Sequence, residues 1–188
     1  MEKRRILLIT QTAVMLALLI GIQLLMTSIF GAPVPLYGQL ITGSAVNLIL
    51  LVSVFFVGLP GGLIIALLSP VLAFFVGIQP PVPQMLIVIP IGNAVFVLIA
   101  WLAEKQISLK NTKDFLISIL TLSVASITKF LILWLGIVKI MIPLMSDIAA
   151  PKVKAITLAF SWPQIITALI ASALALTIVP ILKRVIKT

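Results

Sequence analysis

Residues 6–30 read ILLITQTAVMLALLIGIQLLMTSIF, an apolar run of 25 residues. A helix rises about 1.5 Å per residue, so about 20 apolar residues cross the hydrocarbon core of a bilayer. The basic start MEKRR resembles that of a secretory signal peptide. However, the apolar part of a signal peptide is only about 7–15 residues long, and no small-residue cleavage pattern follows this run. We therefore expect a retained first membrane helix.

The composition extends this expectation to the whole chain. Of its 188 residues, 62% are hydrophobic and 9% are charged, whereas a soluble domain is about half apolar and about a quarter charged. A core of this size cannot hide so much apolar surface, which predicts an integral membrane protein. Cysteine and histidine are both absent. Their absence excludes disulfides, thiol nucleophiles, Cys-bound or His-bound metals and histidine general bases.

Breaks rich in proline, glycine or charge divide the chain into apolar segments. The breaks are GAPVPLYG, GLPGG, QPPVPQ, EKQISLKNTKD and SDIAAPKVK. They predict an all-α bundle that forms a single transmembrane domain over residues 1–188. Its six spans are residues 6–30, 41–57, 63–78, 85–103, 115–145 and 155–182. The fifth is longer than one crossing needs, so it either tilts or breaks near Gly136 or Pro143.

Charge predicts the orientation of these spans. Six crossings place both termini on one side of the membrane. That side carries Lys3, Arg4, Arg5, Lys105, Lys110, Lys113, Lys183, Arg184 and Lys187, and the other carries Lys152 and Lys154. Because basic residues are enriched in cytoplasmic loops, we expect both termini in the cytoplasm.

Polar side chains in the spans concentrate at one depth. Counting along the spans places them roughly 9–14 Å below the outer surface, while the inner halves are nearly pure Leu, Ile, Val and Ala. Such side chains either form hydrogen bonds between helices or line a pocket that is open to the outside. We favour the pocket, because packing contacts have no reason to prefer one leaflet. Its predicted substrate-binding residues are Gln39, Thr42, Asn47, Gln84, Asn93, Lys129, Trp134, Trp162 and Gln164. Ser53, Ser69, Thr121 and Ser123 are interpreted as packing contacts.

Lys129 is the most informative of these residues. A charge inside a membrane helix marks a functional site or an ion pair by default, and no acidic residue lies within any of the six predicted spans. Lys129 either extends toward the outer interface or binds an anionic substrate. Trp134 and Trp162 either stack on a ligand ring or anchor the chain at the interface.

The whole chain resembles an S component, the substrate-binding membrane subunit of an energy-coupling factor (ECF) vitamin transporter. The resemblance rests on TAVMLALL with Ala13 and Ala17, on the loop after the first span, and on GQLITGSAVN, TKFLILWLGIVK and FSWPQIITALI. It implies six helices with both termini inside and a multi-pass place in the bacterial plasma membrane.

The resemblance also implies partners. An S component captures a vitamin from outside and delivers it through a transmembrane coupling subunit and two cytoplasmic ATPases, so the chain itself needs no cofactor. Ala13 and Ala17 would form the stripe that docks on the coupling subunit, and residues 33–39 would close over the substrate. Partners of another kind, such as nucleic acid, are not expected.

The substrate class follows less directly. An unpaired Lys129 favours a small water-soluble vitamin or precursor with a carboxylate, such as pantothenate or nicotinate. The alternatives are an ion-coupled transporter acting alone, which would need carboxylates in the membrane, and a membrane-embedded enzyme built on Ser126 and Lys129. We expect a protein that is not an enzyme.

Overall fold

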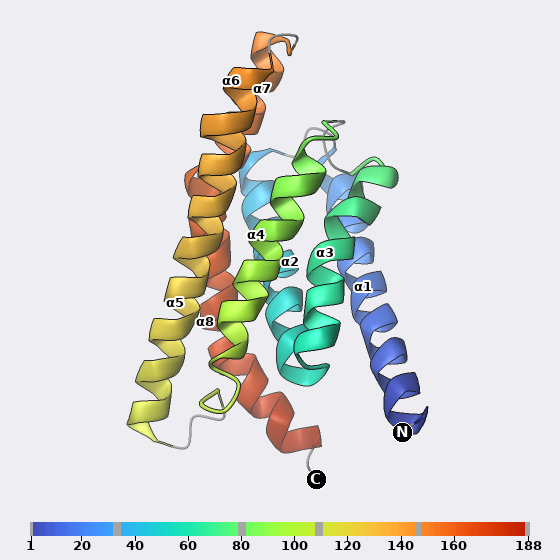
Figure 1. Cartoon of the computed structure of the whole chain (residues 1–188), viewed down its shortest axis with the longest axis vertical. Coiled ribbons are helices and arrows are strands. Elements are labelled where there is room, and N and C mark those ends of the chain that lie inside the picture. The colour runs from blue at the N-terminus through green and yellow to red at the C-terminus, as the bar shows by residue number, and fades with distance from the viewer. Residues whose placement is uncertain (1, 32–34, 79–81, 108–110, 146–147, 187–188) are drawn as a thin grey trace.

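The chain folds into a bundle of helices (Figure 1). The computed structural model describes residues 2–31, 35–78, 82–107, 111–145 and 148–186, and it contains no strand in these ranges. The helices are α1 (Glu2–Phe30), α2 (Leu36–Phe56), α3 (Leu59–Phe75), α4 (Met85–Trp101), α5 (Thr112–Leu133), α6 (Ile142–Leu144), α7 (Ala150–Ala159) and α8 (Trp162–Ile186), with a π-helix, η1 (Trp134–Met141), between α5 and α6. The predicted all-α class is therefore confirmed.

Four helical segments are long and apolar enough to cross a membrane, which fits a multi-pass membrane protein. They are Glu2–Phe30, Leu36–Phe56, Thr112–Leu144 and Ala150–Val185. Helices α3 and α4 have 17 residues each, so each is about 26 Å long and falls slightly short of a hydrocarbon core of about 30 Å.

Helix α2 lies at the centre of the bundle and contacts α1, α3, α4 and α8. Helices α5 and α8 pack against each other on one side of it, and α1 and α3 pack on the other (Figure 1). Both ends of the chain lie at the same end of the bundle.

Helix α2 begins five residues earlier than predicted. The backbone N–H of Gln39 donates to the carbonyl of Pro35 over 2.9 Å, which makes Leu36–Gln39 a helical turn. Proline is tolerated at the start of a helix because the first N–H groups have no partner there. One glycine inside a helix costs only about 1 kcal/mol, so Gly38 does not prevent this turn.

The long fifth span is not interrupted at Gly136 and stays helical from Thr112 to Leu144. Instead the chain widens into η1, where the N–H of Ile142 donates to the carbonyl of Ile137, five residues earlier. Pro143 follows directly, and a proline ring clashes with the carbonyl four residues before it in an α-helix. The wider π turn lets the segment continue to Leu144.

The last span is bent rather than continuous. Helix α7 ends at Ala159 and α8 begins at Trp162, just before Pro163. Proline cannot donate to the carbonyl four residues back, which is that of Ala159. The side chain of Gln164 donates to this carbonyl instead, with Nε2 and O 2.9 Å apart. The predicted single helix over residues 155–182 is therefore wrong at this point, and α7 also includes residues 150–154, which were predicted as a loop.

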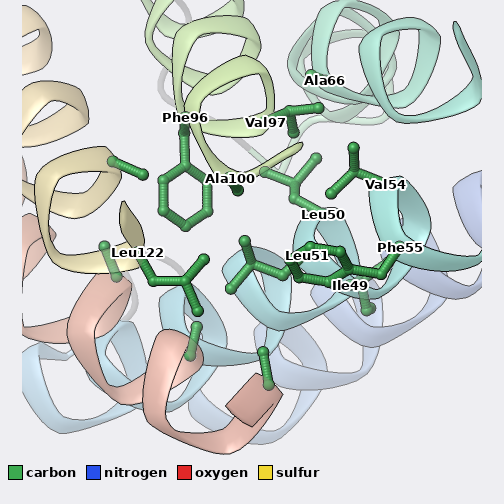
Figure 2. Packing of buried hydrophobic residues seen from close by; sticks show 14 of the residues in the cluster. Ile49, Leu50, Leu51, Val54, Phe55, Ala66, Phe96, Val97, Ala100 and Leu122 are labelled. Atoms are coloured by element: carbon green, nitrogen blue, oxygen red, sulfur yellow. The ribbon is translucent and has the colours of Figure 1, made fainter. Parts of the chain in front are cut away.

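The apolar core fills the half of the bundle nearest the chain ends. It is formed by the later turns of α2 and α4, the early turns of α3, the middle of α5 and the middle and later turns of α8, together with Leu19 of α1. Leu50, Phe96 and Leu122 are fully buried, and Figure 2 shows them pointing into the space between their helices. This packing leaves the opposite half of the bundle for polar side chains.

Candidate functional site

A cavity of about 720 Å³ lies in the half of the bundle away from the chain ends. It is lined by the late turns of α1, α3 and α5, the early turns of α2, α4 and α8, and the inner face of α7. The described residues that line it are Gln23, Thr27, Gln39, Thr42, Gly43, Val46, Asn47, Ser69, Pro70, Gly77, Ile78, Ile89, Asn93, Lys129, Leu133, Pro151, Lys152, Ala155, Ile156, Ala159, Phe160, Pro163, Gln164 and Thr167. Its volume is typical of a small-molecule site.

A chain of hydrogen bonds joins three helices at the wall of this cavity. Lys129 of α5 donates from Nζ to Oδ1 of Asn47 in α2 over 2.5 Å. Asn47 in turn donates from Nδ2 to Oγ1 of Thr167 in α8 over 3.2 Å. Thr167 donates from Oγ1 to the carbonyl of Gln164 over 3.1 Å. Each side chain fixes the next, so the ammonium group has a defined position.

The approach of α2 to α8 depends on a glycine. A Cβ at Gly43 would lie 2.9 Å from Cγ2 of Thr167, which is too close for a real contact. Gly43 therefore lets the two helices come near enough for Asn47 to reach Thr167. A larger residue at position 43 would push α2 away from α8 and break the hydrogen bond between Asn47 and Thr167.

The positive charge of Lys129 is only partly compensated by the protein. Lys129 is buried, and its Nζ lies 5.1 Å from the centre of the Phe96 ring, within the range of a cation–π contact. An amide oxygen and a ring carry no negative charge. An ammonium group has three donors, and one of them goes to Asn47. Neither of the other two donates to a residue in the described part of the chain, so both are available to a ligand.

The cavity as a whole is cationic. Lys152 of α7 is a second basic residue in its lining, and none of the described lining residues is acidic. A low-dielectric cleft that is lined by charges of one sign attracts small ions of the opposite charge. This arrangement favours an anion as the ligand.

Six of the nine predicted substrate-binding residues lie together in the cavity lining, and three lie outside it. Those in the lining are Gln39, Thr42, Asn47, Asn93, Lys129 and Gln164. Gln84 is exposed at the N-terminus of α4. Trp134 stacks on Phe130, and Lys139 lies over its ring. Trp162 is 44% exposed. Neither tryptophan is placed to stack on a ligand in the cavity.

Two of the predicted residues also have local roles. Gln164 satisfies the carbonyl that Pro163 leaves free, so part of its function is to hold the bend between α7 and α8. The hydroxyl of Thr42 donates to the carbonyl of Gly38 over 2.8 Å. Its lone pairs remain available to accept a hydrogen bond from a ligand.

The sequence did not single out Gln23, Thr167 or Ser69 as site residues. Gln23 falls in the same outer half, and Thr167 follows Gln164 by three residues and so shares its helix face. These spacings could have indicated both. Ser69 was interpreted as a packing contact, but it lines the cavity. In contrast, Ser53 donates to the carbonyl of Ile49 in its own helix.

The other predicted regions lie on the outside or partly beyond the described ranges. Ala13 and Ala17 are exposed on α1, of which only Thr12, Leu19 and Gln23 are buried. Of the predicted gate at residues 33–39, positions 33 and 34 lie outside the described residues, and Leu36–Gln39 form the first turn of α2.

Ser126 and Lys129, which the sequence suggested as a nucleophile and its base, have other partners. The Ser126 hydroxyl donates to the carbonyl of Leu122 and lies 3.1 Å from Oγ of Ser172. Across the described part of the chain, no three His, Cys, Asp or Glu side chains come together as metal ligands.

No family model, curated protein or solved structure matches this chain.

Proposed function

We propose that this chain is the substrate-binding S component of an ECF-type importer in a bacterial plasma membrane. In this proposal α1, α2, α3, α4, α5–η1–α6 and α7–α8 are the six spans, with both termini in the cytoplasm. The shared position of the chain ends (Figure 1) and the nine basic residues assigned to that side against two on the other support the orientation.

The observation that carries the proposal is the cationic cavity with Lys129 in its wall. In the proposed orientation this cavity faces the exterior, and the core around Leu50, Phe96 and Leu122 separates it from the cytoplasm. A site with one open side is suited to capture, and passage requires a further conformational change. Such a change fits a subunit that depends on energised partners.

The proposed ligand is a small water-soluble vitamin or precursor with a carboxylate, such as pantothenate or nicotinate. Two of the three Lys129 donors remain for that carboxylate, and Lys152 adds long-range attraction. Delivery would then use a coupling subunit that docks on the Ala13 and Ala17 stripe of α1. Two alanines four residues apart let a partner helix come close. ATP hydrolysis would belong to the partner ATPases.

The purified chain, screened against water-soluble vitamins by native mass spectrometry and thermal shift, tests this function. We expect one vitamin to bind with one molecule per chain and a nanomolar dissociation constant, without ATP or any partner. At a hundred times the dissociation constant, this would stabilise the folded chain by about 2.7 kcal/mol. A chain that binds no vitamin at all would contradict the proposal.

A further inference from the structure

The cavity has a second polar side, which faces the Lys129 side. Gln23 of α1 and Ser69 of α3 supply it, and Asn93 of α4 lies between the two sides, because α4 packs against both α3 and α5. Helix α1 has no substantial contact with α5, and α1 and α3 lie across α2 from α5 and α8 (Figure 1). Gln23 and Ser69 therefore belong to the wall opposite Lys129 in one cavity.

The amide side chains of Gln23 and Asn93 are buried and have no hydrogen-bond partner among the described residues. Gln23 is 8% exposed, and its Oε1 accepts no hydrogen bond from the described residues. Asn93 is 4% exposed, and its side chain likewise forms no hydrogen bond with a described residue. A buried amide without a partner costs a few kcal/mol. A ligand that bonds to these groups would remove that cost.

The chemistry of the two walls differs. Lys129 and Lys152 carry positive charge, whereas Gln23, Ser69 and Asn93 are neutral. A carboxamide offers both a carbonyl acceptor and N–H donors. The second wall is therefore complementary to a neutral amide, urea or hydroxyl group. Val46, Ile89 and Leu133 add apolar surface to the cavity lining.

We propose that the ligand has two unlike ends: a carboxylate held by Lys129, and a neutral amide-like or hydroxyl group held by Gln23 and Asn93. This deepens the proposed function and rests on it for the biological role of the ligand. It predicts that an anion without the neutral end binds weakly, and that a neutral molecule without the carboxylate also binds weakly.

Simple bifunctional acids test the proposal on the full chain in nanodiscs. The probes are glutaramate, adipamate, pimelamate and suberamate, which carry a carboxylate at one end and a carboxamide at the other. Each is compared with the alkanoate and the diamide of the same chain length by isothermal titration calorimetry. At the chain length that binds most tightly, we expect the amido acid to bind about tenfold more tightly than the alkanoate or the diamide of the same length. The reason is that only the amido acid forms its hydrogen bonds at both ends.

Gln23→Leu and Ser118→Ala form a matched pair of variants. Each removes a buried oxygen without a partner, but Ser118 does not line the cavity. Gln23→Leu should abolish the advantage of the amido acid over the alkanoate and keep its advantage over the diamide. Ser118→Ala should change neither. The unfolding temperature of empty Gln23→Leu should not fall, because its Oε1 has no bond to lose.

Three results would overturn the proposal: no binding of any amido acid, equal binding of the alkanoate at every length, or equal effects of the two variants. The failure of the proposed function would look different. If amido acids bind but no vitamin does, the function is rejected and the two-ended site remains. If a vitamin binds and Gln23→Leu does not weaken it, the two-ended site is rejected and the function remains.

Discussion

Lys129 is a basic residue buried inside the bundle. Removal of an ammonium group from water is costly, and the partners supplied here are the Asn47 amide oxygen and the Phe96 ring. Asn47 is itself held by Thr167. The three helices thus preserve a charged donor at a fixed point of the cavity, ready for an anion.

Lys129→Met should weaken the binding of an anionic vitamin about ten- to a hundredfold, because hydrogen bonds to charged groups contribute about 1.5–3 kcal/mol. The variant keeps a side chain of similar length and removes only the charge and its donors. Calorimetric titration of the purified chain measures the change.

Lys139→Met is the matched control for this substitution. Lys139 lies ten residues further along the same segment and contacts Trp134 outside the cavity. It should leave the affinity unchanged. Equal losses of affinity in the two variants would mean that Lys129 acts only through the general positive field.

At the scale of the elements, the apolar segments and their order could be predicted from the sequence, whereas the ends of several helices could not. The thickness of the bilayer requires apolar runs of about 20 residues, and such runs can be recognised from the sequence alone. The bend between α7 and α8 depends on a bond from Gln164 to Ala159. The η1 turn depends on how Pro143 fits its neighbours. Such details follow from specific contacts and not from composition.

The same distinction explains which site residues could be predicted. Depth along a helix follows from counting, so the sequence predicted that Asn47, Asn93 and Lys129 lie at one level, and the structure brings them together in the cavity lining. The direction in which a side chain points depends on packing, so the sequence could not exclude Trp134 and Trp162. Ser69 was missed because a serine in an apolar helix usually bonds within that helix, as Ser53 does.

Gln164→Leu tests the explanation of the bend. The substitution leaves the Ala159 carbonyl without its side-chain donor, while Pro163 still cannot supply one. We expect a loss of about 1 kcal/mol in the free energy of unfolding of the empty chain. The unfolding midpoint in a denaturing detergent series measures it.

Gln84→Leu serves as the control, because Gln84 is exposed at the start of α4 and makes no side-chain cap there. It should be nearly neutral. If Gln164→Leu is equally neutral, the bond to Ala159 does not stabilise the bend.

The molecule as a whole is divided into two unlike halves. Near the chain ends, α2, α3, α4, α5 and α8 pack around an apolar core that also includes Leu19 of α1. In the other half, the same helices together with α1 and α7 surround a polar cavity. Except for α7, each of these helices contributes to both halves, because the polar residues that face the cavity lie toward one end of its sequence. The proposed one-sided access of the cavity depends on this division.

The absence of native cysteine makes that access directly measurable, since a single introduced thiol is the sole target of a thiol reagent. Thr42→Cys places the thiol in the cavity lining. Lys154→Cys and Lys105→Cys place it at exposed positions on the two predicted sides of the membrane, outer and inner. Ser118→Cys places it in a fully buried position of α5.

The most direct test of the account is the rate at which a membrane-impermeant thiol reagent modifies Thr42→Cys in intact cells and in inverted vesicles. We predict modification in intact cells, as for Lys154→Cys, and protection in inverted vesicles, where only Lys105→Cys reacts. Ser118→Cys should react in neither. Modification of Thr42→Cys only in inverted vesicles would contradict a cavity that opens to the exterior and is sealed from the cytoplasm.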